Sequence, residues 1–179
     1  MIYVFLANGF EECEAIAPID ILKRAGFNVI TVGVNGKTAV GSHNIPVVCD
    51  ITADEITFEN LKAVVLPGGM PGTINLENNK VVQETIDYAV DNDLLIGAIC
   101  AAPSILGHKG LLNNKKATCF PGFEKDLLGA TVTNTSVVSD GNIITAKGAG
   151  VAFDFGFSLL AYLKDEKTAN DLKIQMMFN

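Results

Sequence analysis

Leu94–Pro103 (LLIGAICAAP) joins an apolar run to the start of a helical pattern, with a cysteine at the junction. Residues 94–99 form the most strand-like run of the chain, and Ala101–Leu106 is typical of the start of a helix. Strands that pass directly into helices are the repeating unit of α/β proteins. The stretch therefore predicts this fold class, and it places the Cys100 thiol at the amino end of a helix.

Short apolar runs alternate with longer helical stretches along the rest of the chain, which predicts a mostly parallel sheet with helices on both faces. The predicted strands are Ile2–Leu6, Asn28–Val34, Ala63–Leu66, Leu94–Ile99, Ala117–Cys119 and Asn142–Ala146. The predicted helices are Phe10–Ala25, Lys80–Asn92, Ala101–His108, Gly150–Leu163 and Asp165–Met176.

Turn and edge signals complete this prediction. Asn35-Gly36 and Asp140-Gly141 favour hairpin turns, because both dipeptides tolerate positive φ. Pro46 cannot donate to a central ladder, so Asn44–Asp50 is expected at an edge. We find no repeat or linker, and we expect residues 1–179 to form a single domain.

Composition excludes several classes of partner. The 179 residues carry a net charge of −7 and no cluster of basic residues longer than two, which argues against nucleic acid and anionic membranes. A small molecule or a second copy of the chain is the expected partner. Ile2–Ala7 lacks a basic flank and is too short for a signal peptide or a membrane span, so a cytoplasmic location is expected.

Four cysteines, Cys13, Cys49, Cys100 and Cys119, are expected as free thiols, and no Cys/His spacing suggests zinc. The positive end of a helix dipole stabilises a thiolate, and such sites lower the pKa of cysteine. A reactive nucleophile at Cys100 is therefore the leading hypothesis.

Two glycine-rich turns follow predicted strands, Leu66–Gly72 and Lys147–Gly150. Ligands bind beyond the carboxyl ends of parallel strands, so both turns should lie near Cys100. The Gly68-Gly69 turn could supply one donor of an oxyanion hole, and the Ala101 N–H the other. A purely structural role for the glycines is the alternative. The second turn lacks the spacing of a phosphate-binding loop.

Several carboxylates follow the first strand. A charged helix cap suits Glu11 and Glu12. Pro18 lies four residues after Glu14 and predicts a bend that aims the Glu14 side chain inward. Beside a Cys100 thiolate, the pKa of Glu14 should rise until the carboxyl group is protonated and donates a hydrogen bond to sulfur.

Four motifs then carry a resemblance over residues 1 to about 165. Glu11–Glu14 (EECE), Leu66–Gly69 (LPGG), Ala98–Pro103 (AICAAP) and Gly148–Phe153 (GAGVAF) look like the ThiJ/PfpI superfamily, with parkinsonism-associated protein deglycase as the nearer branch. The resemblance implies a flavodoxin-like three-layer sandwich, usually a homodimer. It also implies Cys100 as the nucleophile of the elbow, Glu14 as its acid partner, and Gly69 and Ala101 as oxyanion donors.

The activities implied by this branch are conversion of glyoxal or methylglyoxal to hydroxy acids, repair of early glycation adducts, and oxidant sensing through the elbow cysteine. The expected function is therefore glyoxalase- or deglycase-like turnover of small aldehydes without metal or organic cofactor. The alternative is a redox sensor or a holdase acting through oxidation of Cys100, with little or no turnover.

Departures from the family pattern limit this expectation. Ala101 stands where the protease-like branch has histidine, so proteolysis is not expected. Phe120 stands where the deglycase-like branch commonly has histidine, which removes a general base and leaves Phe120 as a substrate-binding candidate. His43 stands where the relatives often have an arginine. A structural role is expected for both His43 and His108. For His43, the alternative is contact with a partner subunit's site.

The remaining cysteines have structural interpretations. Cys49 is expected to be buried, and Cys13 to face the pocket or a dimer partner. Cys119 is expected to pack in the loop that crosses the pocket, and it could also resolve an oxidised Cys100 as a disulfide.

Overall fold

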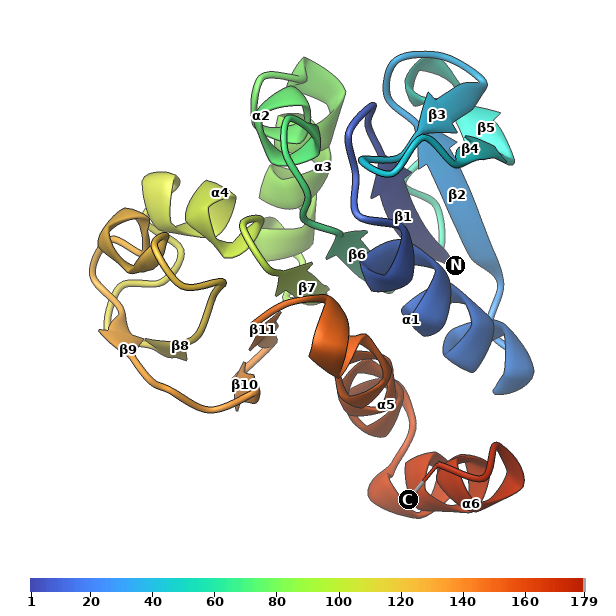
Figure 1. Cartoon of the computed structure of the whole chain (residues 1–179), viewed down its shortest axis with the longest axis vertical. Helices are drawn as coiled ribbons and strands as arrows, with labels where there is room; N and C mark the ends of the chain where they lie inside the picture. The colour runs from blue at the N-terminus through green and yellow to red at the C-terminus, as the bar shows by residue number, and fades with distance from the viewer. Residues whose placement is uncertain (179) are drawn as a thin grey trace.

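The structure, a computed structural model, describes residues 1–178 and is a three-layer α/β sandwich (Figure 1). Its central sheet has seven strands in the order β10-β11-β7-β6-β1-β2-β5. Every described pair in this sheet is parallel except β10 with β11. The strands are β1 Ile2–Leu6, β2 Val29–Gly33, β5 Ile51–Thr52, β6 Ala63–Leu66, β7 Leu95–Ile99, β10 Val137–Asp140 and β11 Ile143–Ala146. The predicted mostly parallel sheet is confirmed.

Helices cover both faces of this sheet (Figure 1). One face carries α1 (Glu12–Arg24) and α5 (Ala152–Leu163), with α6 (Glu166–Gln175) packed on α5. The other face carries α2 (Gly72–Glu77), α3 (Lys80–Asp91) and α4 (Pro103–His108). Three short 3₁₀ turns, Ala53–Glu55, Glu124–Asp126 and Ala149–Val151, lie in the connections. The flavodoxin-like three-layer expectation is therefore confirmed.

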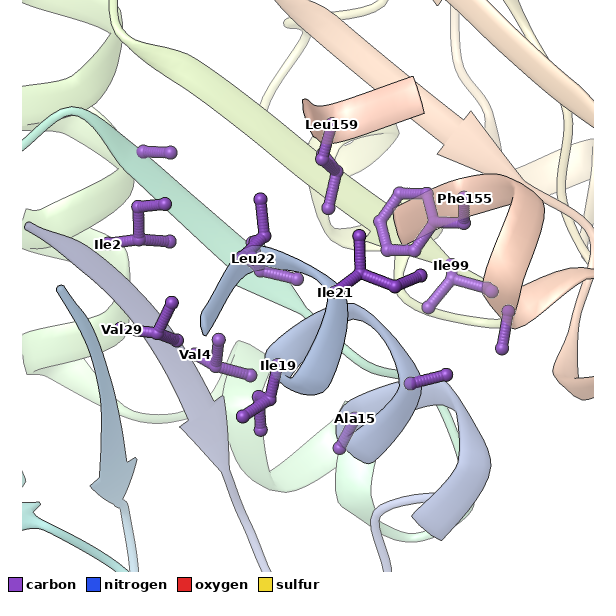
Figure 2. Packing of buried hydrophobic residues seen from close by; sticks show 14 of the residues in the cluster. Ile2, Val4, Ala15, Ile19, Ile21, Leu22, Val29, Ile99, Phe155 and Leu159 are labelled. Carbon is purple, nitrogen blue, oxygen red and sulfur yellow. The ribbon is translucent and has the colours of Figure 1, made fainter. Parts of the chain in front are cut away.

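Successive side chains of a strand point to opposite faces of the sheet, so they alternate between two separate cores. From β1, Ile2 and Val4 join the cluster under α1 and α5, whereas Tyr3 and Phe5 join the cluster under α2, α3 and α4. Figure 2 shows the first cluster, where α1 side chains meet those of the sheet and of α5. Since central strands are buried on both faces, their runs are almost wholly apolar.

Two small ribbons lie outside the main sheet. β3 (Thr38–Val40) pairs antiparallel with β4 (Pro46–Val48), and β8 (Lys116–Ala117) pairs parallel with β9 (Thr131–Val132). The predicted strand at residues 117–119 is therefore shorter and lies in a ribbon of its own. The first ribbon contains Pro46, which agrees with the expected exclusion of this segment from a central ladder.

Of the two predicted hairpins, one is confirmed and one is wrong. Asp140-Gly141 joins β10 to β11, which pair antiparallel. Asn35-Gly36 forms a turn, but β2 and β3 on its two sides belong to different sheets, because both edges of β2 are already occupied by β1 and β5. Among residues 1–178, no helix is long and apolar enough to cross a membrane.

Candidate functional site

The site lies where the order of the strands reverses. The chain leaves β1 to form β2 on one side and later returns to β6 on the other side of β1. The loops after β1 and β6 therefore meet: the Glu11 N–H donates to the Gly68 carbonyl at 2.9 Å, and the Gly72 N–H to the Gly9 carbonyl at 3.3 Å. Such a crevice is the usual ligand site of open α/β sheets.

Cys100 follows β7 in a left-handed backbone conformation, with φ of 65°. This region is costly for residues other than glycine, and it marks strained positions that the surrounding structure must hold in place. Here the Cys100 N–H donates to the Ala146 carbonyl at 2.9 Å, and the Cys100 carbonyl accepts from the Phe120 N–H at 2.8 Å. Both neighbouring segments thus fix the elbow, and its side chain stays partly exposed.

Glu14 lies in the first turn of α1 and is only 1% exposed. Its Oε2 accepts from the Gly68 N–H at 2.9 Å, and the carboxyl group is also hydrogen-bonded by the Ala149 N–H and to the Cys100 side chain. Segments following four strands, β1, β6, β7 and β11, therefore meet at this one carboxyl group. The inward orientation expected for Glu14 agrees with this geometry, and α1 remains a continuous helix through Pro18.

Burial governs the protonation of Cys100 and Glu14, which together form the pair at the centre of the site. Burial raises the pKa of Glu14 to about 7, against its hydrogen bonds with Cys100, Gly68 and Ala149. Burial, followed by the negative charge of Glu14, raises the pKa of Cys100 to about 12, although the Gly69 and Ala101 N–H groups favour the thiolate. The pKa of Glu14 is raised as expected, but burial is the cause, and the hydrogen bond with Cys100 lowers this pKa, contrary to the expected donation from Glu14 to a thiolate.

The thiol pKa lowered by a helix dipole is, however, a wrong prediction. Cys100–Ala102 form a turn, and α4 begins only at Pro103 and has six residues. The dipole of so short and distant a helix is outweighed by burial and by the adjacent carboxyl group. The thiol is therefore protonated at neutral pH, and the carboxyl group hydrogen-bonded to it is that of Glu14.

The Gly68-Gly69 turn is in close contact with the pair. A Cβ on Gly68 would lie 2.5 Å from Cβ of Cys100 and 2.8 Å from Oε2 of Glu14. The Gly68 N–H donates to Glu14, which leaves the Gly69 N–H as the donor that this turn can offer to a ligand; substrate binding by Gly68 stays a prediction. The N–H groups of Gly69 and Ala101 face the sulfur, and their role as oxyanion donors stays a prediction.

Phe120 stands beside the pair and is 48% exposed. With Pro121 and residues 147–151 it lines an apolar groove of about 300 Å³. A Cβ on Gly148 would lie 3.3 Å from the Phe120 ring and 3.7 Å from Oε1 of Glu14. The Lys147–Gly150 turn is thus brought to the site, as its position after a strand predicts.

Glu12 and His43 form a pair that sequence reasoning missed. Glu12 is 7% exposed; its Oε1 accepts from the His43 N–H and its Oε2 contacts the His43 Nδ1, both at 2.8 Å. The sequence predicts a helix cap for both Glu11 and Glu12, but Glu11 alone caps α1, where its carboxylate accepts from the Glu14 N–H at 2.8 Å. His43 lies in the turn between β3 and β4, and no local pattern links residues so far apart. His108 pairs with Glu77 at 2.6 Å at the end of α4, in the structural role expected for it.

Ligand atoms of Glu11, Glu12 and His43 lie within 4.8 Å of one another and could hold a metal ion. Both carboxylates already accept hydrogen bonds inside the chain, so the cluster has a structural explanation.

The other cysteines occupy different environments. Cys49 is buried as expected, and Cys13 is exposed on α1. Cys119 is 4% exposed and packs in the core under α4, whereas Cys100 packs against the core under α1 and α5. Burial, with the charges of Glu124 and Asp126, raises the pKa of Cys119 to about 11. A resolving role for Cys119 stays a prediction.

Comparisons with known proteins match the geometry. The model of the DJ-1/PfpI family matches residues 1–162. The chain is 33% identical over 172 residues to protein dj-1beta of Drosophila melanogaster, covering 94% of this chain and 92% of that relative. It is 34% identical over 144 residues to Deglycase PH1704 of Pyrococcus horikoshii, covering 79% and 86%. A solved variant of DJ-1 superfamily protein STM1931 from Salmonella typhimurium has a TM-score of 0.93 at 35% identity, covering 99% and 98%.

Proposed function

The chain belongs to the DJ-1/PfpI family, and from this we propose that it converts small 2-oxoaldehydes such as methylglyoxal to 2-hydroxy acids, with Cys100 and Glu14 as catalytic residues. The observation that carries the proposal is the hydrogen-bonded pair of a partly exposed thiol and a buried carboxyl group in a strained elbow. A relative named as a deglycase supports aldehyde chemistry for the same type of site.

The first step is addition of sulfur to the aldehyde carbon. Glu14 accepts the thiol proton as the C–S bond forms and the C=O π bond breaks, and it returns this proton to the carbonyl oxygen, which gives a hemithioacetal and leaves Glu14 ionised. A pKa of about 7 suits this base, because about half of it is ionised at neutral pH and it can still return the proton. The N–H groups of Gly69 and Ala101, which face the sulfur, stabilise the developing negative charge on oxygen.

The second step is an internal redox reaction that needs no external oxidant. Glu14 removes the proton from the former aldehyde carbon and delivers a proton to the adjacent ketone carbon, through an enediol. The first carbon is thereby oxidised to a thioester and the second reduced to an alcohol. Water then hydrolyses the thioester, which releases the 2-hydroxy acid and regenerates the thiol.

Formation of lactate from methylglyoxal, without added thiol, tests this proposal. We expect Cys100→Ser to lower kcat/KM by on the order of 10³ and Glu14→Gln by roughly 10² or more. Cys13→Ser is the matched control, because Cys13 is exposed on α1, next to Glu14 in sequence. Retained turnover in Cys100→Ser would exclude the mechanism.

A second candidate is oxidant sensing through Cys100, favoured by the same contacts around the sulfur. A sulfinate at Cys100 would accept from the Gly69 and Ala101 N–H groups and from protonated Glu14. Mass spectrometry after mild peroxide treatment separates the candidates: oxidation of Cys100 without aldehyde turnover supports sensing. Modification confined to Cys13 or Cys49 counts against it.

We also propose that the chain forms a homodimer. Exposed apolar side chains lie on α1 and on the neighbouring β3–β4 ribbon, namely Ile16, Val40, Ile45 and Val48. Two copies that bury these side chains against each other would remove them from water.

A further inference from the structure

The apolar groove beside the pair has no part in the proton transfers proposed above. Its lining consists of the Phe120 ring, Pro121, Lys147 and the backbone-rich segment 148–151, and its volume is about 300 Å³. Ligand pockets start at roughly this size. The groove therefore suits one substituent of a small substrate better than a peptide segment.

Continuity between the groove and the reacting atoms comes from Phe120 and Gly148. The Phe120 N–H donates to the carbonyl of Cys100 at 2.8 Å, so the backbone of Phe120 is held next to Cys100. Gly148 lies between the Phe120 ring and Oε1 of Glu14, as the distances from its missing Cβ show. Its φ of 161° is extended and does not demand glycine. Because Gly148 has no side chain, no Cβ lies between the Phe120 ring and the Glu14 carboxyl group, and the groove adjoins this carboxyl group.

The chemistry of the lining is apolar. Lys147 contributes a charge, but its ammonium donates to the amide oxygen of Asn134. Phe120 offers a large exposed surface to the groove, and aromatic rings bind other rings in offset or edge-to-face contacts. Most of the surface in this lining is apolar, so an aryl or branched alkyl group would be desolvated against Phe120 and Val151.

We infer that Phe120 is a specificity-determining residue, and that the groove binds the substituent R of a 2-oxoaldehyde R–CO–CHO with preference for aryl and branched alkyl groups over hydrogen or methyl. This inference rests on the proposed function. The reaction is unchanged: phenylglyoxal and water give 2-hydroxy-2-phenylacetate, with the aldehyde carbon oxidised and the ketone carbon reduced.

The test measures kcat and KM for glyoxal, methylglyoxal and phenylglyoxal in the unaltered protein and in Phe120→Ala, Phe120→Leu and Phe153→Ala. Phe153 is the matched control, since it is 43% exposed but stacks on Phe178 outside the groove. We expect kcat/KM for phenylglyoxal to exceed that for methylglyoxal by about tenfold or more, mainly through KM. Phe120→Ala should remove most of this preference, Phe120→Leu should retain part of it, and Phe153→Ala should leave it unchanged.

The outcomes separate this inference from the proposed function. If methylglyoxal is turned over but Phe120→Ala leaves the preference intact, or no preference exists, the inference is wrong and the proposed function stands. If no 2-oxoaldehyde is turned over, both are wrong. Circular dichroism of each variant, and binding of 2-hydroxy-2-phenylacetate against lactate to Cys100→Ser, provide readouts that do not depend on turnover; equal binding of the two acids would also overturn the inference.

Discussion

In the proposed mechanism, the buried carboxyl group of Glu14 controls the chemistry at Cys100. Because burial raises the pKa of Glu14 to about 7, its charge changes in the physiological range rather than near the ordinary value of 4.5. Below pH 7 the carboxyl group is protonated and cannot accept the thiol proton. We expect kcat/KM for methylglyoxal to rise about tenfold per pH unit up to about pH 7 and then to level off.

The control for this pH profile is Glu14→Gln, which should lose the rise along with most of its activity. Stability should move in the opposite direction to activity. The folded pKa lies above the unfolded value, so the stabilisation from protonated Glu14 is present below pH 4.5 and is lost as pH rises through about 7. A rate that is flat from pH 5.5 to 8 in the unaltered protein would contradict Glu14 as the base.

Gly68 is the residue whose missing side chain makes the pair possible. In Gly68→Ala, the new Cβ would be 2.5 Å from Cβ of Cys100, so the elbow or the turn must move. We expect a loss of about 1–3 kcal/mol in the free energy of unfolding, measured by urea denaturation, together with loss of turnover. Gly150→Ala is the control for stability, because a Cβ there would meet nothing within 4 Å. Equal midpoints for the two variants would argue against a tight contact at Gly68.

Some residues of this site could be predicted from the sequence alone. The elbow cysteine, the acid after the first strand and the two turns follow from their positions next to strands. The direction of the thiol pKa did not follow, because it depends on the distance to Glu14 and on burial, which are set by packing rather than by the local sequence. The Glu12–His43 pair was missed for the same reason.

At the scale of elements, long and strongly apolar runs were the predictable part. The bounds of β1 and β6 are as predicted, and those of β2, β7, α3 and α5 differ by at most two residues at an end. The elements that the sequence did not predict, α2, β3, β5 and β9, are short; α2 has six residues and β5 two. Such elements are stabilised by tertiary contacts, so they leave little periodic signal in the sequence.

The contact between α1 and the β3–β4 ribbon depends on Glu12. Although burial opposes it, hydrogen bonds from His43 lower the pKa of Glu12 overall. Glu12→Ala would remove the acceptor for the His43 N–H and ring, so amide hydrogen exchange in Gly41–Ile45 should accelerate about tenfold or more. Glu59→Ala, at an exposed position, is the control. Unchanged exchange rates in the turn would show that other contacts hold the ribbon.

At the scale of the whole molecule, the sheet order places the site. The reversal between β2 and β6 brings the loops after β1 and β6 together, and β7 and β11 follow in the adjacent positions. The sequence predicted a crevice at the strand ends, but it did not predict which strands are neighbours, because strand order is a property of long-range pairing. That residues 1–179 form one domain stays a prediction; within the described residues, Ala169 and Leu172 of α6 join the core under α1 and α5.

The proposed homodimer is tested at the same scale. We expect light scattering after gel filtration to give twice the chain mass of 19.0 kDa. Ile16→Lys would place a charge among the exposed apolar side chains of α1 and the β3–β4 ribbon, and it should shift the mass toward the monomer. Ile174→Lys is the control, since Ile174 is exposed on α6. A monomer in the unaltered protein, or equal masses for both variants, would rule out this interface.

At Cys100, the left-handed backbone is less costly for glycine than for cysteine, whereas the proposed function requires the cysteine thiol. Glycine adopts a positive φ without steric strain, so replacing Cys100 by glycine should stabilise the fold. A laboratory screen that rewards only heat resistance should therefore enrich Cys100→Gly and discard the thiol. A cysteine that survives such a conflict over many generations would be evidence of purifying selection on its sulfur.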